Sequence, residues 1–208
     1  MSPVKIGVLI SGSGTNLQTL IDNITSGDIY GEISVVISNK KDAYGLTRAK
    51  NNGIDAIYID RKNSLDDIEF NKKIIEELKK RDVQLVVLAG YLRILSSEFI
   101  SQFRNRIINI HPSLIPSFCG KGYYGEKVHK AVLDYGAKIT GATVHFVDEE
   151  ADTGPIIFQK SVEISEGDNV ETLKNKVLEV EHLLLSEAVR LYCKDKIIVS
   201  GRKVIVRE

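Results

Sequence analysis

Several classes of protein are excluded by what this sequence has little of. Only two cysteines occur, Cys119 and Cys193, far apart and without C-x-x-C spacing, so neither a disulfide framework nor a zinc site is predicted. Lysine plus arginine equals aspartate plus glutamate at 28 each, so no overall field draws the chain to nucleic acid or to an anionic membrane. No apolar run approaches the ~18 residues of a membrane-spanning helix. Any anion binding must therefore be local.

The length and hydrophobic share fit an ordinary globular protein. The chain has 208 residues and is 43% hydrophobic, which is enough for one domain with a sizeable core over residues 1–208. Its first residues run into a strand-like segment without the pattern of a signal peptide. We therefore expect a cytoplasmic protein, monomer or homodimer, with small-molecule substrates and no nucleic-acid or membrane partner.

Strand-like and helix-like segments alternate through the first half of the chain. β-Branched runs bounded by glycine or polar residues predict strands, and apolar residues at helical spacing between them predict helices. Such alternation implies parallel strands in a doubly wound sheet. The expected strands are 4–10, 32–38, 55–59, 83–90 and 106–110, and the expected helices are 17–27, 43–53, 64–81 and 96–103.

The pattern changes after a further helix at 125–136. The runs 139–147 and 155–164 are seven residues apart, too close for a full helix between them, so an antiparallel pair is predicted. A long helix follows from Asn169, and residues 196–206 predict a hairpin around Ser200-Gly201. The predicted fold class is α/β, a single-domain Rossmann-like doubly wound sheet, mostly parallel with antiparallel C-terminal strands.

A glycine-rich loop separates the first strand from the first helix, in VLISGSGTNLQ (8–18). A dinucleotide site needs a third glycine, where Leu17 stands, and an acid after the second strand, where 38–41 read Ser-Asn-Lys-Lys. The triphosphate motif G-x-x-x-x-G-K-[ST] is absent from the sequence. Two interpretations remain: a monophosphate site with Thr15 and Asn16 as donors, or a tight turn whose helix is capped by Ser13 or Thr15.

Polar residues gather where strands are expected to end. In INIHPSLIPSF, Asn109 and His111 are two residues apart and face the same side of an extended chain, with Ile110 facing the other way. In open α/β sheets ligands bind beyond the carboxyl ends of strands. This favours a functional pair, although a hydrogen-bonded histidine beside a turn-forming asparagine is the alternative.

The stretch DEEADTGPI (148–156) joins the two antiparallel runs. We expect Asp148, Glu149 and Glu150 to lie in a solvated loop. Asp152 differs, because it precedes a sharp turn into a buried strand and can be held against His111. A paired carboxylate raises the pKa of a histidine, which favours a proton donor near neutral pH.

A third polar stretch, AGYLRILSSEF, follows the most apolar strand. Gly90 permits close backbone approach, and Leu92, Ile94 and Leu95 are suited to wall an apolar pocket. Arg93 is either a ligand contact or part of a surface salt bridge.

These stretches together resemble the folate-dependent phosphoribosylglycinamide formyltransferase family. The matching segments are VLISGSGTNLQ, VISNKKDAYGLTRA, VVLAGYLRILS, NIHPSLIP, GATVHFVDEEADTGPII and EVEH. The resemblance implies transfer of a formyl group from 10-formyltetrahydrofolate, as co-substrate, to the amine of glycinamide ribonucleotide in purine biosynthesis, without a metal. It implies that Asn109 and protonated His111 stabilise the oxyanion of a tetrahedral intermediate while Asp152 assists.

The resemblance also implies which residues bind the two substrates. Glycinamide ribonucleotide is expected at Gly14, Thr15, Asn16 and Glu181. Folate is expected at Leu92, Arg93, Ile94, Leu95, Asn109, Asp148, Glu149, Glu150, Ala151 and Asp152.

One stretch departs from the family pattern, and several alternatives stay open. Where relatives often carry PGLH, this chain reads SFCGKGYYGEKVHKAV, so no role carries over to Lys121 or Cys119. A formyltetrahydrofolate hydrolase is expected to have a further N-terminal domain, and a methionyl-tRNA formyltransferase a further C-terminal one. A sugar-amine formyltransferase would need a site for a nucleotide-linked sugar. A non-catalytic dinucleotide-binding module is the alternative from a different class.

Overall fold

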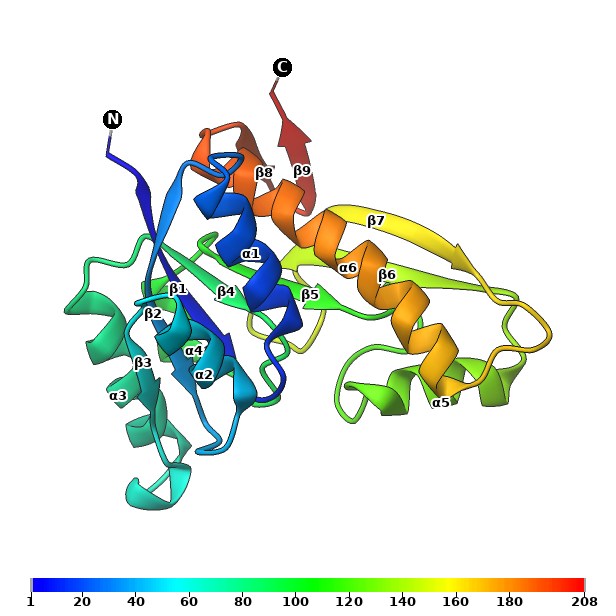
Figure 1. Ribbon diagram of the computed structural model, residues 1–208, viewed down its shortest axis with the longest axis horizontal. Helices are drawn as coiled ribbons and strands as arrows, with labels where there is room; N and C mark the ends of the chain where they lie inside the picture. Colours follow the sequence, from blue (N-terminus) through cyan, green and yellow to red (C-terminus); the bar gives the residue numbers. More distant parts are fainter. Residues whose placement is uncertain (1, 208) are drawn as a thin grey trace. The chain divides into compact units, whose positions relative to one another are not determined.

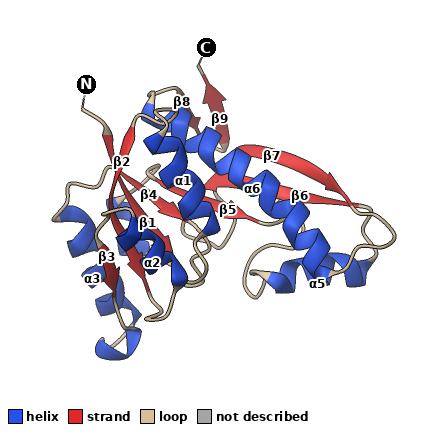
Figure 2. Ribbon diagram, in the orientation of Figure 1, coloured by secondary structure: helices blue, strands red, loops and turns tan. Residues whose placement is uncertain are grey.

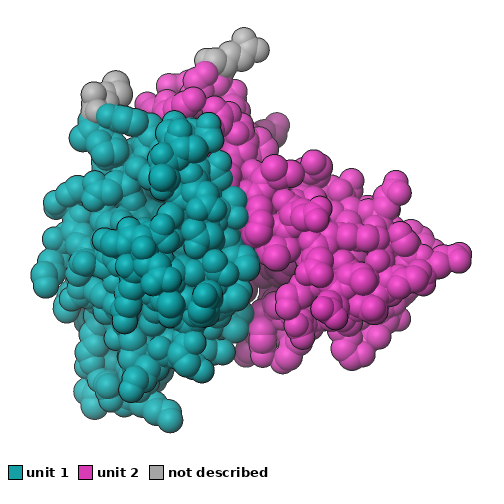
Figure 3. All heavy atoms as spheres, viewed as in Figure 1, with its two compact units in different colours: residues 1–108 teal, residues 109–208 magenta. Residues whose placement is uncertain are grey.

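The computed structural model describes residues 2–207, which form two compact units that divide between Ile108 and Asn109 (Figure 3). The first unit holds four parallel strands in the order β3-β2-β1-β4. They are β1 (Val4–Ile10), β2 (Gly31–Ser38), β3 (Ala56–Tyr58) and β4 (Leu85–Leu88). The predicted parallel arrangement is confirmed.

The helices of the first unit follow from the strand order. The chain passes outward from β1 through β2 to β3 and then returns to form β4 on the other side of β1. Because each crossover is right-handed, the first two helices lie on one face of these strands and the later helices lie on the other face. Figure 1 shows α1 and α2 in front of β1 and β2. The helices are α1 (Thr15–Thr25), α2 (Tyr44–Asn51), α3 (Asp67–Lys79) and α4 (Ser97–Gln102), with a short 3₁₀ turn η1 (Arg61–Asn63) before α3.

The second unit contains the antiparallel strands that the sequence predicts. Strand β6 (Ile139–Phe146) pairs antiparallel with β7 (Ile156–Glu163), and the hairpin of β8 (Ile197–Ser200) and β9 (Lys203–Val206) joins β7 through β9. Helix α6 (Val170–Cys193) packs on β6, β7 and α5 (Glu126–Tyr135), as Figures 1 and 2 show. Strand β5 (Ile107–His111) begins in the first unit and ends in the second, so its terminal Asn109 and His111 belong to the second.

Two helix starts differ from the prediction. The helix expected from residue 64 begins at Asp67, where the Asp66 side chain caps α3 by accepting from the Glu69 N–H, because Ser64 ends η1. Helix α1 starts after Gly14, which has a left-handed conformation at φ 71°, and no side chain caps it. Its first N–H groups therefore have neither Ser13 nor Thr15 as a cap.

Close packing of β6 on β7 predicts a stability effect at Gly141. A Cβ at this position would collide with the backbone oxygen of Lys160 and lie 2.8 Å from Leu114 Cδ2. We expect Gly141→Ala to lower the free energy of unfolding by about 2 kcal/mol or more, measured by urea denaturation. Gly167→Ala is the matched control, because nothing lies within 4 Å of its Cβ, and equal stability of the two variants would contradict the packing described here.

Candidate active site

The glycine-rich loop of the first unit is fixed by the hydroxyl of Ser11. Ser11 Oγ donates to Asn39 Oδ1 at 2.6 Å and accepts from the Leu92 N–H at 2.9 Å, while Ser11 N donates to Gly90 O at 3.1 Å. One residue thus connects the chain segments that follow β1, β2 and β4. Beyond it, Gly14 and Thr15 start α1. This is the switch point of the strand order, where ligands bind in such folds.

The stretch after β4 is partly exposed and partly core. Leu92 and Ile94 are 45% and 66% exposed, whereas Leu95 is buried. Arg93 Nη2 lies 2.7 Å from Asp67 Oδ1, and the guanidinium stacks over Phe70. Of the two roles open for Arg93, the structure shows the salt bridge.

Asn109 and His111 project from the end of β5 as their spacing predicts. Both are directed at polar partners of the second unit: Asn109 Nδ2 lies 3.0 Å from His145 Nε2, and His111 Nδ1 lies 3.5 Å from Asp152 Oδ2. His111 is 4% exposed, and its Nε2 lies 3.0 Å from the carbonyl oxygen of Phe118. The predicted contact of His111 with Asp152 is confirmed.

The local backbone holds the Asp152 carboxylate in place. Asp152 has a positive φ of 60°, and it precedes Gly154, where any side chain would collide with the carbonyl oxygen of Phe146. Asp152 Oδ2 accepts from the Gly120 N–H at 2.8 Å, and Oδ1 lies 3.7 Å from His145 Nε2. Two histidines and a backbone donor therefore surround this carboxylate.

His145 is the member of the cluster that sequence reasoning missed. It lies in β6, is 1% exposed, and its Nδ1 lies 2.8 Å from the Phe146 carbonyl oxygen. A carbonyl oxygen only accepts, so Nδ1 carries a proton, and in the neutral ring Nε2 accepts from Asn109 Nδ2. His145 thereby fixes the orientation of the Asn109 amide. The sequence pattern that could have identified His145 is its spacing from Thr143, because the two polar residues lie on the same face of a buried strand.

The pKa of His111 departs from expectation. Burial lowers it below its usual range, and the Asp152 carboxylate and the Phe118 carbonyl offset this only in part. The sequence predicted a raised pKa from Asp152 alone, which is wrong because the ring is almost fully desolvated. For Asp152, burial favours the neutral acid, but contacts with His145, His111 and the Gly120 N–H outweigh it and lower the pKa.

These pKa directions define the resting proton distribution. Near neutral pH Asp152 is ionised and His111 is mostly neutral. Because Nε2 faces a carbonyl oxygen, the proton of neutral His111 resides there and the Nδ1 lone pair faces the carboxylate. An added proton therefore binds at Nδ1, where it forms an ion pair with Asp152.

The remaining predicted residues are placed as follows. Glu149 and Glu150 are exposed, while Asp148 accepts from Thr153 Oγ1 at 2.6 Å, which orders the loop. Ala151 is half-buried in the same loop, Glu181 is half-buried on α6, and Asn16 is buried on α1. Thr15 is half-buried at the start of α1.

The loop at 117–125, for which no family role was available, reaches the cluster through its backbone. The Phe118 carbonyl contacts His111, and the Gly120 N–H binds Asp152. The Cys119 thiol between them has a pKa raised by burial. Lys121 is exposed.

Residues 2–207 offer neither a metal-binding cluster nor a membrane-spanning helix. They contain no group of three or more His, Cys, Asp and Glu side chains arranged to hold a metal ion. Within the same range, no helix is both long and apolar enough to cross a membrane.

Comparison with known proteins assigns the family. A model of the formyl transferase family matches residues 4–189, and the chain belongs to that family. A protein of Haemophilus influenzae named phosphoribosylglycinamide formyltransferase is 42% identical over 93% of this chain and 89% of its own length. A chloroplastic protein of that name from Vigna unguiculata is 40% identical over 93% of this chain, which spans only 62% of that relative.

A solved structure agrees with the fold. The glycinamide ribonucleotide transformylase 1 of Symbiobacterium toebii has a TM-score of 0.94 and 43% identity, covering 99% of this chain and 95% of its own. The mostly parallel α/β fold with antiparallel C-terminal strands is thus shared with that enzyme.

The contact of Asp152 with His111 predicts a measurable pKa change. Removing the carboxylate charge removes the larger of the two contacts that offset burial, so we expect Asp152→Asn to lower the pKa of His111 further, as measured by NMR titration of the imidazole. Asp148→Asn, in the same loop, is the control and leaves this pKa in place. A His111 pKa that does not respond to Asp152→Asn would show that the two groups do not interact.

His129 on α5 predicts a loss of stability in acid. Burial lowers the pKa of this 3%-exposed side chain from 6.5 to about 4, so the unfolded chain binds its proton first as the pH falls. Stability is unaffected above about pH 6.5 and decreases below it, by roughly 2 kcal/mol at pH 5 from this group. We expect His129→Gln to remove that part of the decrease, measured as urea unfolding free energies at pH 7.5 and 5.

The outcome depends on the pH slope and not on the absolute stability of the variant. His129→Asn should share the reduced slope even if its stability at pH 7.5 differs. Stability curves for wild type and both variants that run parallel between pH 7.5 and 5 would contradict a depressed His129 pKa.

Proposed function

We propose that this chain is a phosphoribosylglycinamide formyltransferase, acting over residues 1–208 as a single formyltransferase domain. It transfers the formyl group of 10-formyltetrahydrofolate to the amine of glycinamide ribonucleotide in purine biosynthesis. The observation that carries the proposal is the cluster of Asn109, Asp152 and the buried His111 in a chain that matches nearly the whole of a relative so named.

The cluster supplies what formyl transfer to an amine requires. Attack of the amine on the formyl carbon forms a C–N bond and places negative charge on the formyl oxygen. The second N–H of Asn109, whose amide is oriented by His145, donates to that oxygen. His111 takes up the proton that the attacking amine loses and becomes the cationic donor beside Asp152; this proton then passes to the folate nitrogen when the C–N bond to the cofactor breaks.

Substrate entry changes the partner of His111. In the structure its Nε2 is bonded to the Phe118 carbonyl, so a substrate oxygen that accepts from Nε2 replaces this backbone oxygen. The contact keeps the imidazole in one tautomer until substrate is bound. Such fixed orientation lowers the reorganisation needed during the reaction.

Substrate binding is divided among the other predicted residues. We assign the ribose phosphate to Gly14, Thr15 and Asn16, because the uncapped start of α1 offers N–H groups and the positive end of a helix dipole. Glu181 is assigned to the glycinamide part. The folate is assigned to Leu92, Arg93, Ile94 and Leu95 with the loop 148–152 and Asn109, and no metal is required.

The setting of this activity follows from the same assignment. The substrates are small molecules, the location is the cytoplasm, and the enzyme acts as a monomer or homodimer without nucleic acid or membrane. Formyltetrahydrofolate hydrolysis is the second candidate, since the same cluster can stabilise attack by water. The loop at Gly14 favours the transferase, because hydrolysis needs no phosphate-binding residues.

The test is an activity assay with and without the ribonucleotide. We expect formylation of glycinamide ribonucleotide, with kcat reduced about 10²–10³-fold by Asn109→Ala and at least as strongly by His111→Ala or Asp152→Asn. Lys130→Ala, an exposed change on α5, should leave kcat within about two-fold. Release of formate at the same rate without the ribonucleotide would reject the transferase in favour of the hydrolase.

A further inference from the structure

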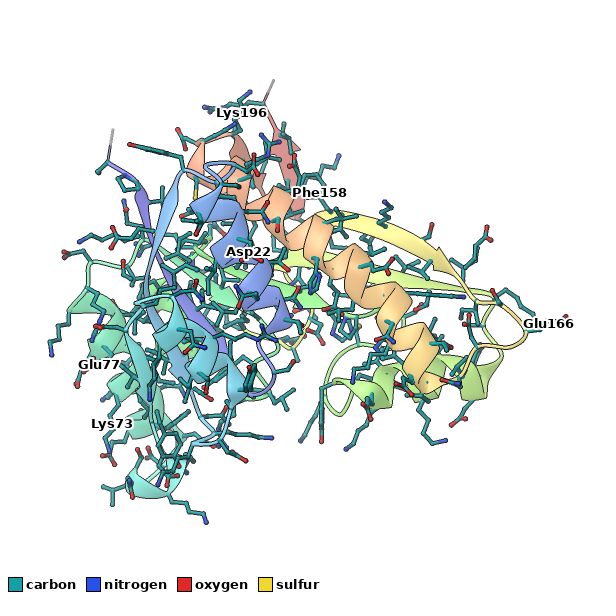
Figure 4. All side chains as sticks on the ribbon, in the orientation of Figure 1. Asp22, Lys73, Glu77, Phe158, Glu166 and Lys196 are labelled. Atoms are coloured by element: carbon teal, nitrogen blue, oxygen red, sulfur yellow. The ribbon has the colours of Figure 1, made fainter. Side chains whose placement is uncertain are left out.

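Arg48 on α2 makes all of its polar contacts with the glycine-rich loop and the helix that follows it. Its Nε donates to the Ser13 carbonyl at 2.9 Å, and its Nη1 donates to Gln18 Oε1 at 3.3 Å. Gln18 in turn donates to Asp22, which is labelled on α1 in Figure 4. On its other side the guanidinium stacks over the Tyr44 ring, 5.0 Å from its centroid. The side chain is therefore held in one orientation beside the loop.

The backbone brings α2 against the same loop. Gly45 N donates to Gly12 O at 3.1 Å, and a Cβ on Gly14 would lie 2.7 Å from Gly45 Cα and 3.5 Å from Arg48 Cδ. Arg48 follows Gly45 by three residues, so both lie on the side of α2 that faces the loop. Glycine at positions 14 and 45 is what permits the approach. Arg48 is thus packed on the residues that start α1.

The charge of Arg48 is not neutralised by the protein. Its partners are a carbonyl, a side-chain amide and an aromatic ring, all of them neutral, and within residues 2–207 no carboxylate forms an ion pair with it. By contrast Arg61, Arg81 and Arg93 each pair with an aspartate. A fixed, half-buried guanidinium without an acidic partner beside uncapped helix N–H groups is a strong point of attraction for an anion.

We propose that Arg48 is a phosphate-recognition residue of the ribonucleotide site: it orders the loop through Ser13 and supplies one full positive charge to the phosphate dianion. The inference rests on the proposed role of Gly14, Thr15 and Asn16 in holding that phosphate. It deepens that role, because backbone N–H groups and a helix dipole offer only partial charges. Arg48 is the formal cation of the site, and it acts on binding and not on the formyl transfer step.

The experiment compares glycinamide ribonucleotide with its dephosphorylated riboside, each with 10-formyltetrahydrofolate. The ratio of kcat/KM for the two acceptors measures the contribution of the phosphate. We expect a large ratio for wild type and a ratio at least ten-fold smaller for Arg48→Ala. The change should lie in the KM for the ribonucleotide, whereas kcat and the KM for folate should be little affected. Binding of ribose 5-phosphate, measured by calorimetry, should weaken in parallel.

Two conservative variants separate charge from loop ordering. Arg48→Lys keeps the charge without the planar donor pair, and Arg48→Gln keeps a donor without the charge. We expect Arg48→Lys to retain more of the phosphate preference than Arg48→Gln. Lys50→Ala removes an exposed cation from the same helix and should leave the ratio unchanged. These variants keep the test decisive if Arg48→Ala does not fold.

The outcomes distinguish the inference from the function on which it rests. A wild-type enzyme that treats ribonucleotide and riboside alike would reject the phosphate site itself. A wild-type preference that Arg48→Ala and Arg48→Gln preserve would overturn the role of Arg48 and leave the proposed function standing. Equal loss of activity towards both acceptors would also overturn it, because that result indicates a purely structural residue.

Discussion

The largely buried carboxylate of Asp152, with a side chain 14% exposed, is the constraint on which the candidate active site depends. A charge removed from water is tolerated only where donors and opposite charge surround it. Here the Gly120 N–H donates to it, and His111 Nδ1 and His145 Nε2 lie 3.5 and 3.7 Å from it, each from a different segment of the second unit. The antiparallel pair of β6 and β7 brings the loop of Asp152 to this place, and Gly154 allows the chain to turn tightly against Phe146.

The same constraint explains how the segment after the NIHPSLIP motif can depart from the family pattern. Phe118 and Gly120 reach His111 and Asp152 through a backbone carbonyl, which every residue has, and a backbone N–H, which every residue except proline has. What this segment must conserve is therefore its backbone path, not its side chains. Positive φ angles at Phe118 and Gly120 are part of that path. Sequence comparison of side chains alone gives no indication of such a role.

The sequence was informative wherever local pattern decides the outcome. The two-residue spacing of Asn109 and His111 predicted that they share one face of a strand. The short link between two strand-like runs predicted the β6–β7 pair, and the position of Asp152 in that link predicted its approach to His111. It failed where distant contacts decide. His145 became a site residue only through Asn109 and Asp152, and the pKa of His111 falls because burial, which a string of residues does not reveal, exceeds the effect of Asp152. Likewise the helix expected from residue 64 begins only at Asp67, after a 3₁₀ turn at Arg61–Asn63.

Neutralised and unneutralised charges mark different tasks in this molecule. Asp152 is enclosed by partners that the protein itself supplies, so its charge acts on the pKa of His111 within the molecule. Arg48 is held rigidly by neutral partners, so its charge remains available for a ligand. A chain with equal numbers of acidic and basic residues has no overall field with which to attract a phosphate. Recognition of an anionic substrate must then depend on single, fixed charges such as Arg48, and their placement, more than net charge, determines which anion is bound.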